Sequence, residues 1–349
     1  MNRVPMSKNF KVALVAIAAN EAAYMAQFVY HHLRMGFSPI ILMTNNSEDD
    51  TAVMAAQMAA RLPEVIHIDA DPWREVWPIN EFQKRAYQLA LHMIDGMQVK
   101  PDYVMFLDVD EFWVPLTGDT TVSAYINRHD APDTMMFNWV VPDKDDAPFS
   151  NAFVPDFVGV PHNHMKMLWR YGGTVTVLNA HVVTAPEFQR EIVVSGRPLT
   201  GRHATLGAPD HPGNGMILHQ MFRSLPEYVA TLERGNPADD RPFKMNRWGF
   251  RHVIRTGKKV SVPLGPEVCK AWEHDFPIWL ERLGLSLLLI AGRRNAIERA
   301  ARGLELYLSM TEADREPYRN PFLFVDFDAV QGFVSQTLSD PVRHLHRIP

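Results

Sequence analysis

Two acids separated by one residue, Asp108 and Asp110, carry the most specific chemistry in the sequence. They follow the apolar stretch 103–107, which predicts a buried strand. Alternation along an extended chain points the two carboxylates to the same side. Paired carboxylates at a strand end suit Mg²⁺ or Mn²⁺, hard cations that bind oxygen and keep positions open for phosphate. The pattern therefore indicates a site for a metal ion and a diphosphate.

The elements before this motif alternate between strand and helix patterns. Apolar runs predict strands at 11–18, 39–43, 65–68 and 103–107, and amphipathic stretches predict helices at 22–35, 51–62 and 80–94. Asn80 and Gln83 have the spacing of a capping box at the start of the last helix. This alternation predicts an α/β fold with a mostly parallel sheet and ligand loops at the carboxyl ends of its strands: 19–21, 44–50 and 108–112.

Several function classes lack their signatures. The sequence has no Gly-x-Gly-x-x-Gly, P-loop or Gly-x-Ser-x-Gly motif. A net charge of −5 argues against nucleic acid as a partner. Cys269 is the single cysteine, which excludes an intramolecular disulfide and a thiolate zinc site. The first ten residues do not resemble a signal peptide, and no 18-residue apolar run occurs.

Five stretches together resemble a GT-A-type glycosyltransferase of the family 2 kind, in the branch related to glycosyltransferase family 92. They span about residues 11 to 236, in the order of the family: Asn20-Glu21, the acidic loop 46–50, Gln83, Asp108-Val109-Asp110-Glu111-Phe112, and the block from His219 to Tyr228 followed by Arg234-Gly235. The resemblance implies a GT-A-like fold that binds a nucleotide sugar over the carboxyl ends of the sheet. It also implies Mn²⁺ or Mg²⁺ as the cofactor.

The resemblance assigns roles to these residues. Donor binding is expected of the two strand-end loops and their surroundings, that is, of Asn20, Glu21, Asn46, Asp49, Asp50, Gln83 and Asp108. Asp108 and Asp110 are the expected metal ligands, with His219 completing the metal sphere and Glu111 as a supporting partner. Lys166 and Arg223 are expected to contact the diphosphate or the acceptor; Arg223 stands where the branch has Lys, and Gln220 where it has Tyr.

Two further sets of residues leave alternatives open. His162 and His164 form a His-x-His pair, but a zinc site would need further ligands. An inverting transfer needs a base near the acceptor hydroxyl, and Asp143, which follows the strand expected at 134–139, is our first candidate. Its rivals are Asp145, Asp146, Glu187 and Asp210.

The sequence thus predicts a transferase domain over 1–265, with a nucleotide-binding half (11–113) and an acceptor and metal half (114–265), and a helical region over 266–349. We expect a metal-dependent hexosyltransferase-like glycosyltransferase that uses a UDP-hexose, with a glycan, lipid-linked or small-molecule acceptor and inversion. The alternatives are a non-catalytic carbohydrate-binding protein and a sugar nucleotidyltransferase. The expected location is the cytoplasm, with peripheral association at the cytoplasmic face of a membrane as a further expectation.

Overall fold

The first third of the chain folds as its hydrophobic pattern predicts. The computed structural model describes residues 8–144, 147–151, 153–199, 205, 207–235 and 241–345, except for the side chains of residues 342 and 343. Four strands pair in parallel in the order β3-β2-β1-β4. The elements of this parallel half are β1 (Val12–Ala18), α1 (Met25–Arg34), β2 (Phe37–Thr44), α2 (Thr51–Arg61), β3 (Val65–Asp69), α3 (Asp71–Arg74), α4 (Phe82–Asp95) and β4 (Tyr103–Phe106).

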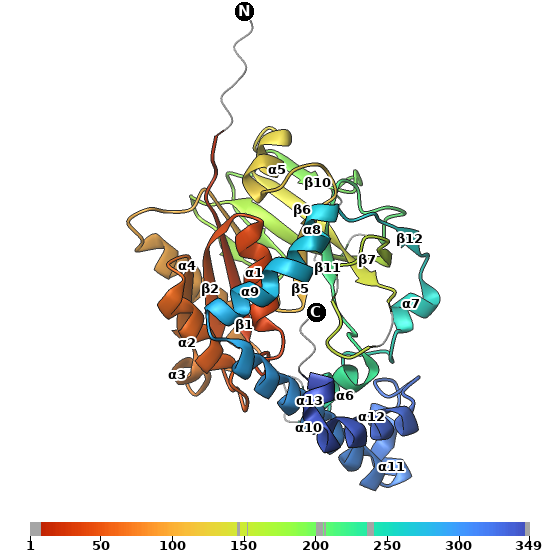
Figure 1. The fold of residues 1–349 in the computed structure, drawn as a ribbon. Coiled ribbons are helices and arrows are strands. Elements are labelled where there is room, and N and C mark those ends of the chain that lie inside the picture. The colour runs from red at the N-terminus through yellow and green to blue at the C-terminus, as the bar shows by residue number, and fades with distance from the viewer. Residues whose placement is uncertain are drawn as a thin grey trace, which may run out of the picture.

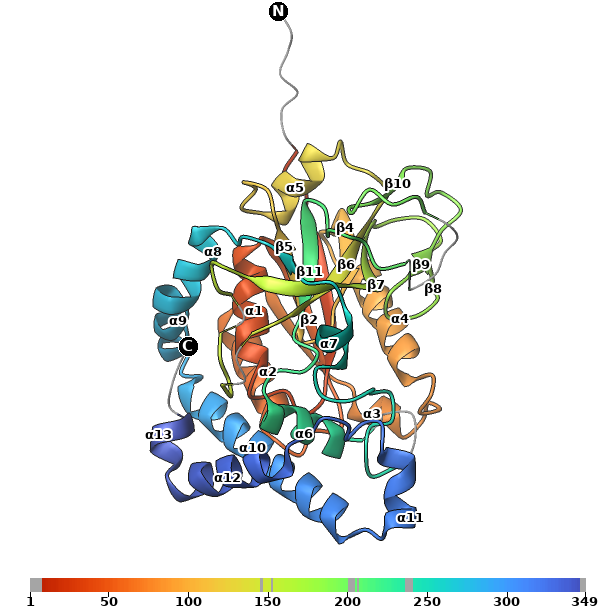
Figure 2. The same ribbon diagram turned by 90° about the vertical axis from the view of Figure 1, so that its right-hand side faces the viewer.

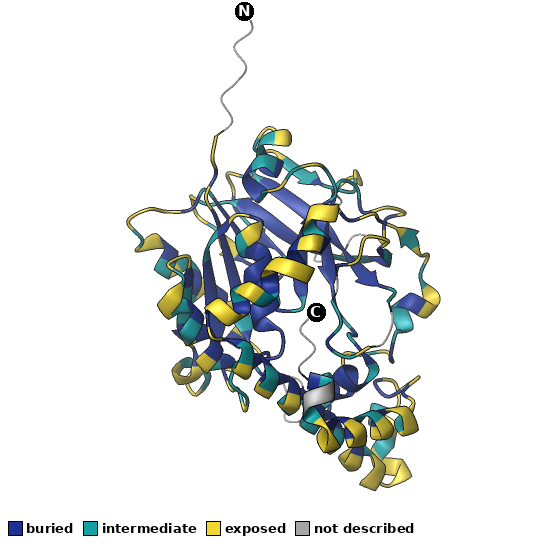
Figure 3. Cartoon of the chain, in the orientation of Figure 1, coloured by how far each residue is buried: buried dark blue, intermediate teal, exposed yellow. Residues whose placement is uncertain are grey.

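The centre of the parallel half is buried on both faces because β1 and β4 carry apolar residues at every position. Val12 and Leu14 of β1 belong to the core beneath α1 and α2, whereas Ala13 and Val15 belong to the core beneath α4. Figure 2 shows α1 and α4 on opposite sides of the sheet. Figure 3 shows the strands as the most deeply buried part of the chain, with exposed residues on the outer helix surfaces. This burial explains the unbroken apolar runs in the sequence.

Beyond β4 the sheet becomes mixed. It continues in the order β4-β7-β6-β11-β5, in which β7 is antiparallel to both neighbours and β11 is parallel to β6 and antiparallel to β5. One further short strand pairs with β6 and another with β7, and two others form a separate two-stranded sheet. The elements are β5 (Glu111–Pro115), α5 (Val122–Arg128), β6 (Thr134–Pro142), β7 (Val158–Arg170), β8 (Thr176–Val177), β9 (Val183–Thr184), β10 (Glu191–Val193), β11 (Gly215–His219) and β12 (Val260–Ser261).

Two local predictions differ from the structure. Residues 142–161 contain several prolines and no hydrophobic period, a pattern that predicts a long loop, but β7 already begins at Val158 and carries the His-x-His pair within the sheet. Helix α4 begins at Phe82, and its N-cap, Glu81, makes no side-chain capping bond, so the capping box predicted at Asn80 is wrong. A capping box does occur at α6 (Leu225–Glu233), where Ser224 and Glu227 satisfy each other's backbone N–H groups.

The C-terminal region, expected to be helical, contains only helices among its described elements. They are α8 (Pro266–Lys270), the π-helical turn η1 (Ala271–Asp275), α9 (Phe276–Arg282), α10 (Ser286–Ser309), α11 (Glu312–Arg315), the 3-10 turn η2 (Glu316–Tyr318), α12 (Phe327–Ser339) and α13 (Pro341–Leu345), preceded by α7 (His252–Thr256). Figure 1 shows α10 to α13 gathered below the sheet, next to α6. A domain boundary at residue 265 stays a prediction.

Helix α10 packs closely on the first ligand loop. Gly292 lies so near this loop that an added Cβ would approach the backbone of Ala22 and Ala23 to 2.6 Å. The buried guanidinium of Arg299 donates to the carbonyl oxygen of Asn20 at 3.2 Å. Within the described chain, no helix combines the length and the apolar character that a membrane span requires. The helical region therefore supports the loop after β1 directly.

Candidate nucleotide-sugar site

One cavity of about 880 Å³ opens at the carboxyl ends of the parallel strands. Its wall combines the loops after β1, β2 and β4 with parts of β6, β7, β11 and the segment 241–253. Seven of the predicted site residues line it: Asn20, Glu21, Asn46, Gln83, Asp108, Asp110 and His219. Five others do not: Asp49, Asp50, Asp143, Lys166 and Arg223. We call this space the main cavity.

The acidic motif forms a turn between β4 and β5 rather than an extended segment. The N–H of Asp108 donates to a carboxylate oxygen of Glu111 at 2.9 Å, and the N–H of Glu111 donates back to the carbonyl of Asp108 at 2.9 Å. Both aspartates nevertheless face the main cavity, with side chains 37 % and 23 % exposed. The turn presents the two carboxylates and turns Glu111 into the core.

Lys166 lies beneath the acidic turn and not in the cavity. Its fully buried ammonium group, on β7, contacts Asp108 at 3.0 Å and Glu111 at 2.9 Å. Burial acts to lower the pKa of Lys166, but the charges of Asp108 and Glu111 outweigh it and raise this pKa above its usual value. The expected diphosphate contact is therefore replaced by an internal one: Lys166 is the counter-charge that makes a buried Glu111 and a half-buried Asp108 tolerable.

Asp110 and His219 face each other across the cavity floor. His219 Nε2 lies 3.4 Å from Asp110 Oδ2, longer than the ~2.9 Å of a normal N–H···O bond. Burial works against it, but His219 lowers the pKa of the Asp110 carboxyl, which stays ionised. His219 Nδ1 is buried without a hydrogen-bond partner in the described structure. A carboxylate and an imidazole at this separation suit one small divalent cation, whose ligand distances are ~2.0–2.2 Å.

The residues present fit a metal that completes its coordination with phosphate. Among the described residues, no group of three or more His, Cys, Asp or Glu side chains is placed to hold an ion by itself. Mg²⁺-like sites of nucleotide enzymes commonly use one or two carboxylates together with substrate phosphates. Asp110 and His219, with Asp108 beside them, offer such a partial set.

The loops after β1 and β2 are braced against each other. Asn20, with a positive φ of 57°, accepts the N–H of Glu48 through its side-chain oxygen at 2.7 Å. Asp49 accepts the N–H groups of Thr51 and Ala22, at 3.0 and 3.1 Å. Asp49 was predicted to bind the nucleotide-sugar donor, but its carboxylate holds the two loops together instead. Asp50 lies at the start of α2, outside the cavity lining.

Glu21 and Arg223 form a second brace. Arg223 contacts one carboxylate oxygen of Glu21 at 3.0 Å, and Arg234 contacts the other at 2.5 Å. The guanidinium of Arg223 also lies 3.3 Å from the ring centre of Tyr24. The carboxylate of Glu21 is therefore committed to two arginines, and Arg223 holds the loop after β1 rather than reaching the main cavity.

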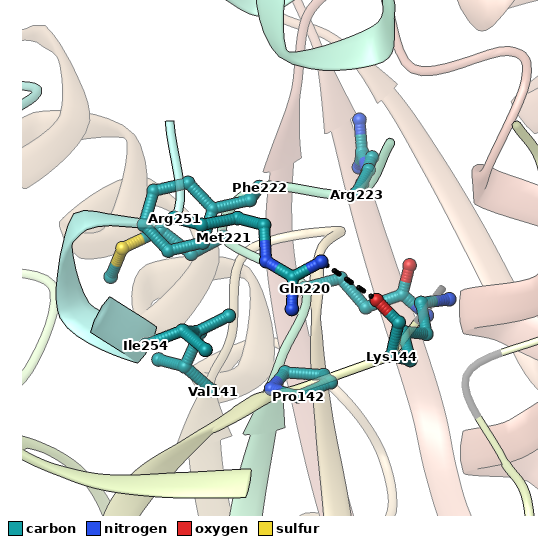
Figure 4. Close-up of a pocket in the computed structure, with 9 residues that line it drawn as sticks. All are labelled: Val141, Pro142, Lys144, Gln220, Met221, Phe222, Arg223, Arg251 and Ile254. Carbon is teal, nitrogen blue, oxygen red and sulfur yellow. Dashed lines mark hydrogen bonds between the residues drawn. The ribbon is translucent and has the colours of Figure 1, made fainter. Parts of the chain in front are cut away.

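Asp143 lies between Pro142 and Lys144, which line a small crevice separate from the main cavity (Figure 4). It pairs with Arg251 and, at 2.5 Å, with Lys259, and its side chain is only 16 % exposed. Figure 4 shows Arg251 extended toward Lys144, whose carbonyl oxygen it contacts at 3.2 Å. Two cations and the absence of Asp143 from the lining of the main cavity leave the predicted base without a geometric basis. Its rivals Asp145 and Asp146 lie outside the described residues, and Glu187 and Asp210 do not line the cavity.

A basic wall, defined as Arg234, Lys244 and Arg247, faces the acidic turn across the main cavity. Burial, with repulsion from the other two cations, holds the pKa of Lys244 well below its usual range. The Nε of Arg247 is buried without a hydrogen-bond partner in the described structure. Like charges gathered in this way are stabilised by an anion. Lys244 and Arg247 were not predicted, because they belong to a segment without hydrophobic period or motif.

A histidine wall, defined as His162, His164 and His181, forms the side of the cavity over β7 and the turn before β9. These imidazoles surround Trp139 of β6, whose ring centre lies 4.7 Å from that of His164 and 4.1 Å from that of His219. The sequence shows His162 and His164 as a pair, but nothing in it indicates that His181 joins them.

Comparison with known proteins adds little. No protein-family model and no curated protein matches the chain. A mannosyltransferase from Pyrobaculum calidifontis in complex with GDP-Man and Mn²⁺ is similar over 98 % of this chain and 84 % of its own, with 14 % identity and a TM-score of 0.30. A CMP-2-keto-3-deoxy-manno-octonic acid synthetase complexed with CTP covers 46 % and 74 %, with 14 % identity and a TM-score of 0.25. Such scores support no argument, so the function has to be derived from the site itself.

Proposed function

We propose that the protein is a metal-dependent glycosyltransferase of the GT-A type, which transfers a sugar from a nucleoside-diphosphate sugar. The observation that carries this proposal is the pairing of Asp108, Asp110 and His219 with the basic wall across one cavity. A diphosphate is the common ligand that needs both a carboxylate-bound cation and direct cationic contacts. The position of this pairing at the carboxyl ends of parallel strands agrees with nucleotide binding in α/β folds.

The residues of the site divide the work of donor binding. Asp108, Asp110 and His219 would hold Mn²⁺ or Mg²⁺, which when bound neutralises charge on the departing diphosphate. Lys244 and Arg247 would contact phosphate oxygens from the opposite side, which stabilises the same charge without a covalent intermediate. Lys166 fixes the Asp108 carboxylate, and the arginines on Glu21 fix the loop after β1.

The nucleoside would lie at the other end of the cavity. Asn20, Asn46 and Gln83 line this end, and their amides can both donate to and accept from a base or a ribose. We propose a UDP-hexose as the first donor to test, on the family resemblance, with transfer by inversion to a glycan, lipid-linked or small-molecule acceptor.

A nucleotide screen tests this function. Thermal unfolding of the full chain would be followed with UDP, GDP and CDP, each with Mn²⁺ and with EDTA. One nucleoside diphosphate should raise the midpoint by several degrees with Mn²⁺ and by much less with EDTA, since ligand binding stabilises by mass action. The exposed variant Asp130→Asn, outside the cavity, should give the same shift as the wild type. No metal-dependent shift with any of the three nucleotides would contradict the proposal.

A further inference from the structure

The histidine wall presents three imidazoles with a common arrangement. Each has its Nδ1 engaged by protein atoms, and for none of the three does the described structure contain a hydrogen bond to Nε2. All three side chains are half-buried and line the main cavity. Each ring is therefore held in place through Nδ1, and its Nε2 stays available to a ligand in the main cavity.

The partner of His181 fixes its tautomer. His181 Nδ1 lies 2.8 Å from the carbonyl oxygen of Met165, which can only accept a hydrogen bond. Nδ1 therefore carries the proton. In a neutral ring the other nitrogen then has a lone pair, so Nε2 of His181 offers the cavity a hydrogen-bond acceptor.

His162 and His164 contact each other, and their neutral rings have opposite tautomers. The backbone N–H of His164 donates to Nδ1 of His162 at 3.3 Å, so this nitrogen is an acceptor and the proton of His162 lies on Nε2. Nδ1 of His164 lies 3.2 Å from the same acceptor and 3.0 Å from Oδ1 of Asn163, and so it is the donor. Nε2 of His162 therefore offers the cavity a donor, and Nε2 of His164 offers an acceptor.

Packing and charge keep this surface neutral and in place. The ring of His164 stacks on Trp139 at 4.7 Å with an interplanar angle of 11°, and it lies 4.9 Å from the ring of His162. Burial lowers the pKa of His162 to about 4 and that of His181 to about 3, and it lowers the pKa of His164 as well. Lys166 and His219 add repulsion that works in the same direction.

The position of the wall relates it to the proposed diphosphate site. The nucleoside loops follow β1 and β2, and the acidic turn follows β4. His162 and His164 lie on β7, the next strand in the sheet, and Trp139 on β6 beyond it. A ligand that extends from the nucleoside loops past the acidic turn therefore meets the histidine wall next.

We propose that His162, His164 and His181 form a subsite for an uncharged sugar ring, whose hydroxyl groups pair with one imidazole donor and two imidazole acceptors. This inference rests on the proposed function, because the ring belongs either to the sugar of the donor or to a sugar of the acceptor. A hydroxyl both donates and accepts, which matches the mixed set. A phosphate would meet two lone pairs and no positive charge, and a three-histidine metal site would need the lone pair that protonated Nε2 of His162 lacks.

Calorimetry on the full-length protein with Mn²⁺ tests the subsite through matched variants. His162→Ala and His164→Ala are compared with His129→Ala, which removes a half-buried imidazole bonded to Asn214 outside the cavity. The probes are UDP and GDP, and UDP-glucose, UDP-galactose and GDP-mannose. If the ring is the sugar of the donor, His162→Ala and His164→Ala should weaken binding of a nucleotide sugar about tenfold. The affinity for the parent nucleoside diphosphate should then change less than twofold. For an acceptor sugar, both affinities stay unchanged and the acceptor KM rises about tenfold in the transfer assay.

Saturation-transfer NMR with methyl glucoside, galactoside and mannoside examines the subsite without any nucleotide. Signals that are present for the wild type and for His129→Ala, and that fall in His162→Ala and His164→Ala, would support it even if no nucleotide binds. The proposed function alone would then fail. The inference is overturned, and the proposed function kept, if nucleotides bind with Mn²⁺ while the wall variants match His129→Ala in every sugar-dependent measurement. Stoichiometric Zn²⁺ binding that disappears in His162→Ala would also overturn it.

Discussion

The acidic turn and the histidine wall line one cavity, yet they are built in opposite ways. The turn carries Asp108 and Asp110, with the buried Lys166 beneath and the basic wall across from it. The histidine wall holds no charged side chain, and its three rings stay neutral through burial and packing. Charged groups suit a metal diphosphate, and neutral donors and acceptors suit hydroxyls. The contrast indicates that the cavity recognises the two parts of a nucleotide sugar, or a donor and an acceptor, by different physical means.

The strongest way to break the charged side is to remove its buried counter-charge. Lys166→Met leaves Glu111 without a cation in a fully buried position. Burial raises the pKa of Glu111 to about 8, so above this pH we expect a loss of about 3–5 kcal/mol in the free energy of unfolding, the usual cost of breaking a buried ion pair. Urea denaturation of the variant measures it. Lys166→Met/Glu111→Leu, which removes both charges, should recover much of this loss; a single variant as stable as the wild type would show that the pair is not ionised.

Buried histidines far from the cavity sharpen the comparison, because their neutrality serves the core alone. His31, on α1, donates from its Nε2–H to the buried carbonyl oxygen of Trp113 at 2.8 Å, so Nε2 carries the proton of the neutral ring. Burial, with a smaller contribution from Arg34, lowers its pKa from 6.5 to about 4. Between these values the unfolded chain binds the extra proton, so stability should fall as the pH drops, by about 2 kcal/mol at pH 5.

Denaturant titrations between pH 7 and pH 4 measure this slope. Other buried histidines with lowered pKa values, such as His32 and His162, keep part of the slope, so His31→Phe should reduce it without abolishing it, whatever the variant's stability at pH 7. His211→Ala, which removes an exposed imidazole, should leave the slope unchanged. Equal slopes in all three proteins would mean that His31 takes up its proton in the folded state.

A smaller effect is expected from the basic wall. Lys244→Met removes one cation that faces the acidic turn and keeps the length of the side chain. Affinity for a nucleoside diphosphate with Mn²⁺ should fall about tenfold, in keeping with one charge-assisted contact, and the affinity for the nucleoside should not change. Calorimetry at two salt concentrations measures both. Lys258→Met, at an exposed lysine paired with Asp210, is the matched control. An equal loss of affinity in the two variants would mean that Lys244 acts only through the overall charge of the protein and not through a contact with the diphosphate.

The sequence predicts the parallel half well because its strands are buried on both faces and separated by amphipathic helices. Val12–Ala18 and Tyr103–Phe106 are recognised by their apolar runs. The strand Val158–Arg170 is not, since Pro161 and the two histidines interrupt its pattern. The strand Gly215–His219 is short and begins where a stretch with the pattern of a loop, 196–215, ends. Local pattern carries no information about pairing across the mixed half of the sheet.

The site shows the same limit. Asp108 and Asp110 were predicted from residue type and spacing and His219 from the family resemblance, and the structure brings the three to one cavity. Lys166, Arg223 and Asp49 were expected to contact the ligand, but their charged side chains pair with other groups of the protein. Lys244 and His181 join the cavity only through tertiary packing, which no spacing in the sequence reveals.

Metal-dependent nucleotide binding by Asp110→Asn tests the central claim most directly. The variant replaces one carboxylate oxygen of the proposed metal site by an amide nitrogen and preserves shape. Calorimetry with the nucleoside diphosphate that the screen selects, in Mn²⁺ and in EDTA, compares it with the wild type and with Asp130→Asn. We predict that the wild type and Asp130→Asn bind at least tenfold more tightly in Mn²⁺ than in EDTA, and that Asp110→Asn binds equally weakly in both. An undiminished Mn²⁺ dependence in Asp110→Asn would contradict the account.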